Sequence, residues 1–311
     1  MNGVHKIVFG PVPSRRLGLS LGVNNIPPKI CTYSCIYCQV GRTLTYEVER
    51  KAFYEPSQVI KEVEHVLDKE KPDYVTFVPD GEPTLDENLG FEIKGIKELG
   101  TKIAVITNGS LLYRKDVRDD LMYADLVSVK VDTVDEKIYL RVNRPHGSLS
   151  LSKVLEGKLT FSHEYEGELI TETMLVRDVN DGDPFRLAEF LNALAPKRAY
   201  IAVPIRPPAE PWVKPPKEDR LLAFYEVVRE VVDHVELLSY PEEGEFRSGG
   251  GRPEEELLLI LSVHPMRIEK VKEFLRERAS APEAIIKALI KAGKVKRVRY
   301  LGKEFLVRNL E

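Results

Sequence analysis

The residues from Ser20 to about Ile205 alternate short β-rich runs with amphipathic stretches, and no other feature limits the possible folds as strongly. Six runs are predicted to be strands: 19–23, 74–78, 103–106, 126–131, 169–176 and 199–203. The clearest helix between them covers 57–69, where aliphatic residues recur at helical spacing. Several strands are apolar on both faces, and parallel strands need long crossover connections. The pattern therefore predicts an α/β fold, a partial (βα)6 barrel of the TIM type, in which the loops after the strands carry the chemistry.

The chain is predicted to divide into three parts. Residues 1–216 form the barrel-like core, which ends in the proline-rich segment 204–216. Residues 217–252 hold a helix, a strand at 235–238 and a glycine-containing flexible linker from 241 to 253. Residues 253–311 contain three predicted helices and a hairpin, which together suggest a small winged-helix-like domain: 254–261, 268–276, 282–292 and 295–308.

Charge is distributed unevenly along the chain. The net charge is −3, yet residues 252–311 carry 14 Lys+Arg against 9 Asp+Glu. The cations on the last predicted helix and hairpin are Lys291, Lys294, Lys296, Arg297, Arg299, Lys303 and Arg308. Such a surface is typical of one that neutralises phosphates, so we expect an RNA partner bound through residues such as Lys296 and Arg297. A protein-binding surface is the alternative.

The hydrophobic pattern predicts neither a membrane span nor a secretory signal. No run of about 18 uncharged apolar residues occurs, which a transmembrane helix would need. Residues 1–16 lack the apolar stretch of a signal peptide, so a cytoplasmic protein is expected.

The three cysteines, Cys31, Cys35 and Cys38, form one C-x3-C-x2-C segment after the first predicted strand. A zinc site is one interpretation, but structural zinc takes four ligands, and the nearest downstream histidine, His65, lies in a predicted helix. Iron–sulfur clusters are also held by thiolates, and three thiolates on a four-iron cluster leave one iron free for another ligand. The spacing therefore favours such a cluster.

With Tyr37 preceding the last cysteine, this segment resembles the signature of the radical S-adenosylmethionine (SAM) superfamily. The resemblance implies that Cys31, Cys35 and Cys38 bind a 4Fe–4S cluster whose fourth iron holds SAM. It also implies an external electron donor of the ferredoxin or flavodoxin type, whose electron cleaves SAM to a 5′-deoxyadenosyl radical.

Three further segments match the superfamily in the expected order. Segment 79–84 corresponds to the Gly-Gly-Glu-Pro loop that holds the methionyl ammonium, with Asp80 in place of the first glycine. Segment 107–109 corresponds to a loop that lines the cofactor pocket, and segment 129–132 to a strand end that often supplies polar groups to the ribose and carboxylate of SAM. The resemblance therefore implies SAM contacts by seven residues: Tyr37, Gly81, Glu82, Pro83, Asn108, Lys130 and Asp132. For Lys130 and Asp132, which share one face of a strand, a buried structural ion pair is the alternative.

Segments 9–16, 80–85 and 142–145 look like a mainly prokaryotic branch related to the enzymes that build the wyosine base of transfer RNA. Those relatives use a second cluster with its own three cysteines, whereas this sequence has three in all. A one-cluster enzyme is therefore expected, and chemistry that needs an auxiliary cluster is not.

Candidate substrate contacts come from a set of basic residues near these motifs, because arginine can bind a phosphate or carboxylate with two hydrogen bonds. They are Arg15, Arg16, Arg141, Arg144 and His146. The leading hypothesis is a radical SAM enzyme that modifies a nucleoside in tRNA or rRNA. An activase that installs a radical on a partner protein is the alternative, followed by an iron–sulfur regulator that binds DNA.

Overall fold

An eight-stranded sheet lies at the centre of the molecule in the computed structural model, which describes residues 7–247 and 251–309. The strand order is β1-β2-β5-β6-β7-β8-β9-β10. The strands are β1 Val8–Ser14, β2 Gly18–Val23, β5 Tyr74–Phe77, β6 Ile103–Thr107, β7 Leu126–Lys130, β8 Glu168–Met174, β9 Arg198–Ala202 and β10 Val235–Leu238.

The six predicted strands correspond to β2 and β5 to β9, which run parallel to one another as expected. The sheet is wider than six strands because each edge gains one more. β1 pairs antiparallel with β2, and β10 pairs parallel with β9. The strand at 235–238 therefore belongs to the same sheet as the core, and the predicted division between 1–216 and 217–252 does not separate it from that sheet.

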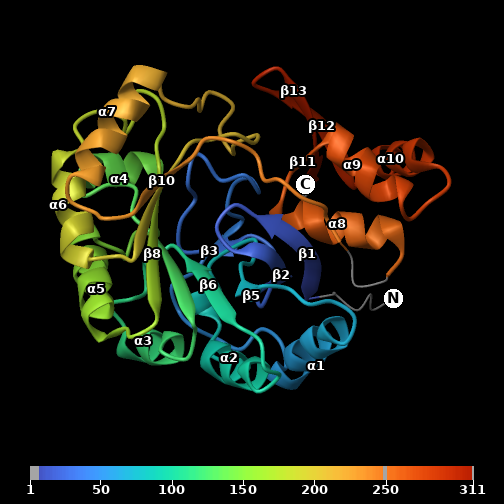
Figure 1. Ribbon diagram of the computed structural model, residues 1–311, viewed down its shortest axis with the longest axis horizontal. Helices are drawn as coiled ribbons and strands as arrows, with labels where there is room; N and C mark the ends of the chain where they lie inside the picture. The colour runs from blue at the N-terminus through green and yellow to red at the C-terminus, as the bar shows by residue number, and fades with distance from the viewer. Residues whose placement is uncertain (1–6, 248–250, 310–311) are drawn as a thin grey trace.

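Helices cover the outer side of this sheet (Figure 1). They are α1 Pro56–Leu67, α2 Leu89–Lys97, α3 Lys115–Leu121, α4 Glu136–Val142, α5 Leu151–Glu164, α6 Phe185–Leu194 and α7 Glu218–Arg229. In α1 the helical spacing places Val59, Val63 and Val66 on the buried face. Each such side chain contributes roughly 1.5–3 kcal/mol when it leaves water. The helix begins at Pro56, a position where the missing N–H costs nothing.

The cysteine segment lies in the long connection between β2 and α1. Two short parallel strands, β3 Ile30–Cys31 and β4 Thr45–Tyr46, stiffen this connection. Ile36 at its centre is fully buried beside Val142 and Val213. The connection is therefore packed against the core at the point where the cysteines occur.

The C-terminal unit, residues 253–308, contains three helices and an antiparallel sheet of order β11-β13-β12. Its elements are α8 Pro253–Val263, β11 Met266–Arg267, α9 Ile268–Arg276, α10 Pro282–Lys291, β12 Val295–Tyr300 and β13 Lys303–Arg308. These match the predicted helices and hairpin, and β11 is an additional strand.

The C-terminal unit shares an apolar core with the edge of the main sheet. Phe9 and Val12 of β1 pack in one cluster with Leu257 and Ile260 of α8. Part of the segment predicted as a flexible linker is also fixed, because Phe246 is buried in this cluster and the Arg247 N–H donates to the Pro11 carbonyl at 2.8 Å. Residues 248–250 of that segment lie outside the described residues. The unit is thus joined to the core by packing as well as by the chain.

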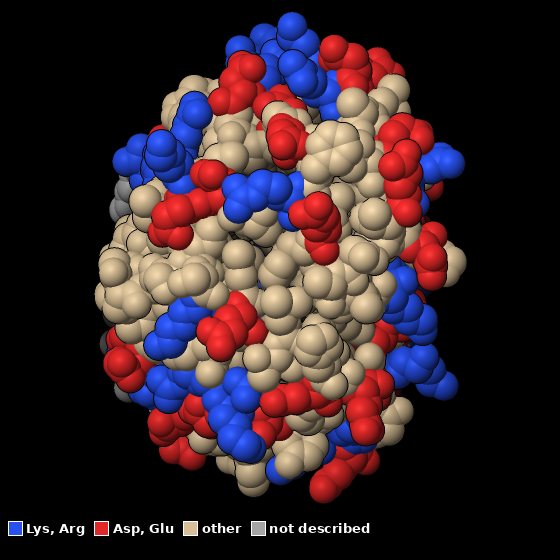
Figure 2. All heavy atoms as spheres, turned by 90° about the vertical axis from the view of Figure 1, so that its left-hand side faces the viewer, with Lys and Arg blue, Asp and Glu red and all other residues tan. Residues whose placement is uncertain are grey.

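The surface over α4 to α7 is mixed in charge. Figure 2 shows that this face carries Lys and Arg intermixed with Asp and Glu, without a large area of one sign. None of the helices in the described ranges is long and apolar enough to cross a membrane.

Candidate functional site

A cleft of about 270 Å³ opens where the parallel strands end. The loops after β5 and β6 and the end of β7 supply Gly81, Glu82, Asn108 and Lys130. Carboxyl ends of parallel strands meet at one edge of a sheet, and this is why segments far apart in sequence converge there. All three cysteines and Tyr37 line the same cleft. The structure therefore brings together most of the residues for which the sequence implied a cofactor role.

The cysteine loop is held by backbone hydrogen bonds to the end of α4. The Ser34 N–H donates to the Asn143 carbonyl at 3.0 Å, and the Ile36 N–H donates to the Val142 carbonyl at 2.9 Å. Within the loop, the Cys38 N–H donates to the Cys35 carbonyl at 3.0 Å. These bonds tie the cysteine loop to the end of α4.

Two amide side chains approach the sulfur atoms. Asn108 Nδ2 lies 3.7 Å from Cys31 Sγ, and Asn143 Nδ2 lies 3.5 Å from Cys35 Sγ. Burial raises the pKa of Cys35 to about 12 and raises the pKa of Cys31 as well. A cationic metal centre reverses that preference because it binds the deprotonated form, and amide donors support the resulting negative charge.

The donor set fits a cluster better than a single ion. Among the described residues, no three His, Cys, Asp or Glu side chains are grouped as a site for one metal ion. The three thiols instead surround a cleft that is also lined by Tyr33 and Asn108. Three thiols that line one cleft agree with a cluster whose irons each bind one thiolate.

Gly81 is required by the close approach of two loops. A Cβ atom at this position would lie 2.0 Å from the Ile30 carbonyl oxygen and 2.6 Å from Ile26 Cδ1. The neighbouring Glu82 N–H donates to the same Ile30 carbonyl at 3.2 Å. The loop after β5 is thereby fastened beside Cys31, and only glycine fits there.

Glu82 is buried and accepts four hydrogen bonds from the protein. Its donors are the Thr84 N–H at 3.2 Å, the Thr84 hydroxyl at 2.7 Å, the Asn108 N–H at 2.8 Å and the Thr107 hydroxyl. Burial raises the pKa of this carboxyl, and the hydrogen bonds act in the opposite direction. A carboxylate has about four acceptor positions. Three of these donors reach Oε1 and the Asn108 N–H reaches Oε2, so Glu82 joins the loops after β5 and β6 and keeps an acceptor position on Oε2.

Asp132 is the centre of a second polar network. It accepts hydrogen bonds from Asn143 Nδ2 at 2.8 Å, from the Met174 N–H at 2.9 Å and from the Tyr37 hydroxyl. Lys130 Nζ lies 3.2 Å from Asp132 and 4.9 Å from the centre of the Tyr37 ring. The buried ion pair considered in the sequence analysis is therefore present, and it also orients Tyr37.

The parallel register of β7 and β8 extends this network from β7 to the adjacent strand β8. Lys130 lies beside Glu172, and the Lys130 Nζ to Glu172 Oε1 distance is 3.0 Å. The other oxygen of Glu172 pairs with Arg16. Burial lowers the pKa of Lys130, while the charge of Asp132 acts to raise it. The two positive charges of this network, on Lys130 and Arg16, are thus matched by two carboxylates, those of Asp132 and Glu172.

Asp80, which departs from the superfamily pattern, is buried at the edge of the cleft. Its Oδ1 accepts from the Lys29 N–H at 2.6 Å, whereas its Oδ2 has no hydrogen-bond partner in the described part of the chain. Burial raises the pKa of Asp80 to about 6. The position thus carries a carboxyl group that is poorly compensated.

Several predicted residues are not among those that line the cleft, and the buried Asp132 is one of them. Pro83 is buried in the short 3-10 turn Pro83–Leu85, and Arg144 pairs with Glu210. Lys296 and Arg297 are exposed on β12, where Arg297 pairs with Glu304 at 3.2 Å. Arg15 and Arg16 do line the cleft.

The sequence analysis missed other lining residues: Lys29, Gln39, Glu172, Met174, Arg206 and Val263. Arg206 and Glu172 had a usable signal, because both are charged residues near the carboxyl end of a parallel strand. Val263 had none, since it reaches the cleft only through the docking of the C-terminal unit.

Comparison with known proteins places these features in a wider group. A family model described as the radical SAM superfamily matches residues 25–191. A UPF0026 protein of Methanocaldococcus jannaschii is 46% identical over 312 residues, which cover 98% of this chain and 97% of that protein. An S-adenosylmethionine-dependent nucleotide dehydratase of Lacinutrix mariniflava is 34% identical over 120 residues, 38% of this chain and 25% of that protein.

Among solved structures, Streptococcus suis SuiB bound to its precursor peptide SuiA is similar in fold. The TM-score is 0.52 at 15% sequence identity, and the match covers 70% of this chain. The chain corresponds to about half of SuiB, 48% of its length. This likeness concerns the α/β architecture with its mostly parallel sheet.

Proposed function

Because the chain belongs to the radical SAM superfamily, whose enzymes use a 4Fe–4S cluster and SAM, we propose that it cleaves SAM reductively to modify a nucleoside in tRNA or rRNA. The proposed cleavage of SAM is supported by one observation. Cys31, Cys35 and Cys38 line the same cleft as the loops after β5 and β6. When bound, the cluster supplies the electron that cleaves SAM, and a ferredoxin or flavodoxin type donor replenishes it.

The chain's own residues divide the work of holding these cofactors. The three cysteines bind the cluster, and Asn108 and Asn143 support two of the sulfurs. Gly81 lets the loop after β5 pack closely beside Cys31, while Glu82 keeps that loop in place. Tyr37 and Lys130 line the cleft and can donate to polar groups of SAM, while the buried Asp132 accepts from Tyr37 and pairs with Lys130.

The RNA half of the proposal depends on the C-terminal unit. We propose that its three helices and small antiparallel sheet act as a winged-helix-like module that recruits RNA. Lys294, Lys296 and Arg299 are exposed on or beside β12, and an exposed basic edge suits a phosphate backbone. The similarity to a nucleotide dehydratase supports a nucleotide-containing substrate. In this reading the core acts in the cytoplasm on a nucleoside presented by the unit.

A peptide or protein substrate is the second candidate. It is favoured by the fold similarity to SuiB, which was solved with its precursor peptide. An activase that acts on a partner protein belongs to the same class.

The first experiment tests SAM cleavage. Purified protein reconstituted with iron and sulfide should form 5′-deoxyadenosine from SAM under dithionite, and the Cys35→Ala variant should not. If wild-type protein with a full complement of iron forms none, the proposed chemistry is wrong.

The second experiment tests the substrate. Nucleosides from tRNA and rRNA of a deletion strain should lack one modification, which mass spectrometry detects and a plasmid copy restores. The Lys296→Glu/Arg297→Glu variant should bind total tRNA or rRNA at least about tenfold more weakly at low salt. Unchanged nucleosides together with a protein partner that co-purifies would favour the second candidate.

A further inference from the structure

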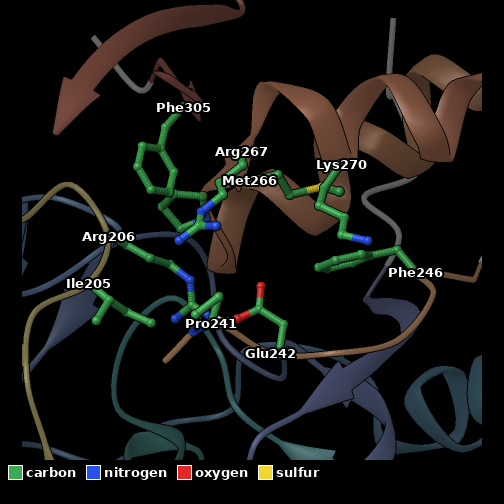
Figure 3. Close-up of a pocket in the computed structure, with 10 residues that line it drawn as sticks. Ile205, Arg206, Pro241, Glu242, Phe246, Met266, Arg267, Lys270 and Phe305 are labelled. Carbon is green, nitrogen blue, oxygen red and sulfur yellow. Dashed lines mark hydrogen bonds and ion pairs between the residues drawn. The ribbon is translucent and has the colours of Figure 1, made fainter. Parts of the chain in front are cut away.

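A second pocket, separate from the cysteine cleft but adjoining it, lies between the core and the C-terminal unit. Figure 3 shows Arg206 and Glu242 on the core side and Arg267 and Lys270 on the opposite side. The pocket measures about 60 Å³. One water-sized group needs roughly 10–15 Å³, so the pocket has room for about four to six. That is the size of a tetrahedral oxyanion.

The side chains that line this pocket carry more positive than negative charge. Glu242 is the one acidic residue among those that line it in the described part of the chain. It already pairs with Arg206 and lies 3.1 Å from His264 Nε2. No carboxylate lies within ion-pair distance of Arg267 among the described residues, and Lys270 has only the exposed Glu273 on its own helix, at 2.7 Å. An anion would correct this imbalance.

The guanidinium of Arg206 is repelled by the positive charges of two neighbouring arginines. Burial lowers its pKa, and the neighbouring charges of Arg15 and Arg267 lower it further, although Glu242 acts to raise it. Arg15 itself donates to the carbonyls of Leu238 at 3.0 Å and Tyr240 at 3.3 Å, which carry no formal charge. Three guanidinium groups thus influence one another around a single carboxylate.

The backbone adds a further favourable field. Arg267 is the N-cap of α9, and Lys270 lies in its first turn, so the positive end of that nine-residue helix is at the pocket. Unpaired N–H groups at a helix N-terminus suit an anion. Phe246 and Phe305 close the sides and limit competition from bulk water.

We propose that this pocket binds a phosphate group, held by Arg206, Arg267 and Lys270 at the junction of the core and the C-terminal unit. The phosphate can come from the backbone of bound RNA, in which case the inference rests on the proposed function, or from free phosphate or a small phosphorylated compound. The chemistry is the same for each source, because arginine offers paired donors that match phosphate oxygens.

The pocket communicates with the cysteine loop through one side chain. Arg206 also lines the cleft, and its Nη1 donates to Gln39 Oε1 at 2.8 Å. Gln39 follows Cys38 directly and donates from Nε2 to the Val263 carbonyl at 2.9 Å. A phosphate bound here would therefore lie next to the site of chemistry, as a backbone phosphate close to a modified nucleoside must.

The test uses the purified full-length protein and inorganic phosphate as the probe. Phosphate should raise the thermal unfolding midpoint in a saturable manner, compared with chloride at equal ionic strength, and should give a binding isotherm in calorimetry. Arg267→Gln and Lys270→Gln should each weaken phosphate binding by about fivefold or more. Arg276→Gln, an exposed cation on the same helix, is the matched control and should bind as wild type.

The outcomes separate the possible sources and the possible failures. Competition between phosphate and tRNA, together with a smaller salt dependence of tRNA binding in Arg267→Gln, would identify an RNA phosphate. Phosphate binding with no effect on tRNA would identify a free phosphate. Phosphate that stabilises no better than chloride, or Arg267→Gln and Lys270→Gln variants that both bind it as wild type, would overturn the proposal. SAM cleavage is measured separately, so failure of the enzymatic proposal remains distinguishable.

Discussion

The cleft lined by the three cysteines and the pocket between the core and the C-terminal unit, here called the junction pocket, share Arg206. They differ in how their charges are compensated. At the cleft, Lys130 pairs with Asp132 and Glu172, and Arg16 pairs with Glu172. Glu82 there accepts four hydrogen bonds. In the pocket, Arg267 lacks a carboxylate partner among the described residues, and Glu242 serves both Arg206 and His264. The cleft is largely satisfied by its own side chains, whereas the pocket has an excess of positive charge.

This difference indicates two ways of binding. A satisfied polar cleft holds its groups in position, so a ligand meets preorganised donors and acceptors and little rearrangement is needed. A pocket with uncompensated cations instead gains most from a charged ligand. We therefore expect changes in the cleft to affect chemistry and stability strongly, and changes in the pocket to affect anion affinity with smaller effects on the rest of the protein.

The largest effect is expected from removing one thiol of the cleft. Cys35→Ala should reduce SAM cleavage by at least about a thousandfold, because a cluster held by two thiolates is not retained. Iron bound per chain measures the loss directly. Metal-free wild type and Cys35→Ala should unfold at similar temperatures, and a variant that keeps both iron and activity would remove Cys35 from the site.

Gly81→Ala tests how tightly the cleft is assembled. The added Cβ would meet the Ile30 carbonyl at 2.0 Å, so the loop after β5 must move away from Cys31. We expect a loss of about 1–3 kcal/mol in unfolding free energy and at least tenfold weaker SAM binding. Gly147→Ala, where a Cβ meets nothing within 4 Å, is the control. Equal behaviour of the two variants would contradict the close approach of the loops.

Asp80→Asn tests a poorly compensated carboxyl group of the cleft. Burial raises the pKa of Asp80 to about 6, above its ordinary value of 3.8. The native state therefore holds this proton more tightly than the unfolded state, so stability is lost as the pH rises from about 4 through 6. The asparagine still accepts from the Lys29 N–H and avoids that loss. We expect the unfolding free energy at pH 7.5 to increase by up to about 3 kcal/mol.

The gain should disappear at pH 4, where Asp80 is protonated in the native protein. Denaturant unfolding of the metal-free protein at both pH values measures it, and Asp119→Asn on the exposed side of α3 serves as the control. A gain that is independent of pH would show that burial of the charge is not its cause.

The smallest effect is expected at the pocket. Glu242→Gln removes the only negative charge among its described lining residues and keeps a side chain of similar shape. Inorganic phosphate should then bind several-fold more tightly, even though loss of the contacts with Arg206 and His264 lowers stability. The exposed neighbour Glu243 provides the control as Glu243→Gln. Unchanged or weaker phosphate binding in Glu242→Gln would mean that positive charge in the pocket is not in excess.

The parts of the fold that could be predicted are those encoded locally. The strands β5 to β9 appear as apolar runs, and the helical face of Val59, Val63 and Val66 appears as a period, so both could be read from neighbouring residues. The cysteine segment and the loops at Gly81 and Asn108 follow strands, and the rule for parallel sheets places them together. These features needed no knowledge of distant contacts.

The remaining features depend on contacts between segments far apart in the chain. Pairing of β10 with β9 places 235–238 in the main sheet, which no local pattern shows. The partners of Glu82 become visible only when Thr107 and Asn108 are brought beside it. The junction pocket needs residues from 205 to 305 at once. Its two aromatic side chains and three cations are unremarkable when taken singly in the sequence.

The hydrogen bond from Gln39 to the Val263 carbonyl has a consequence for the durability of the enzyme. Val263, at the end of α8, lines the cysteine cleft, and Gln39 ties it to the residue after Cys38. We therefore expect the C-terminal unit to limit the access of dissolved oxygen to a cluster bound in this cleft. A chain shortened before α8 would lose that cover, and its cluster would decay faster in air even where the cysteines and the sheet were intact.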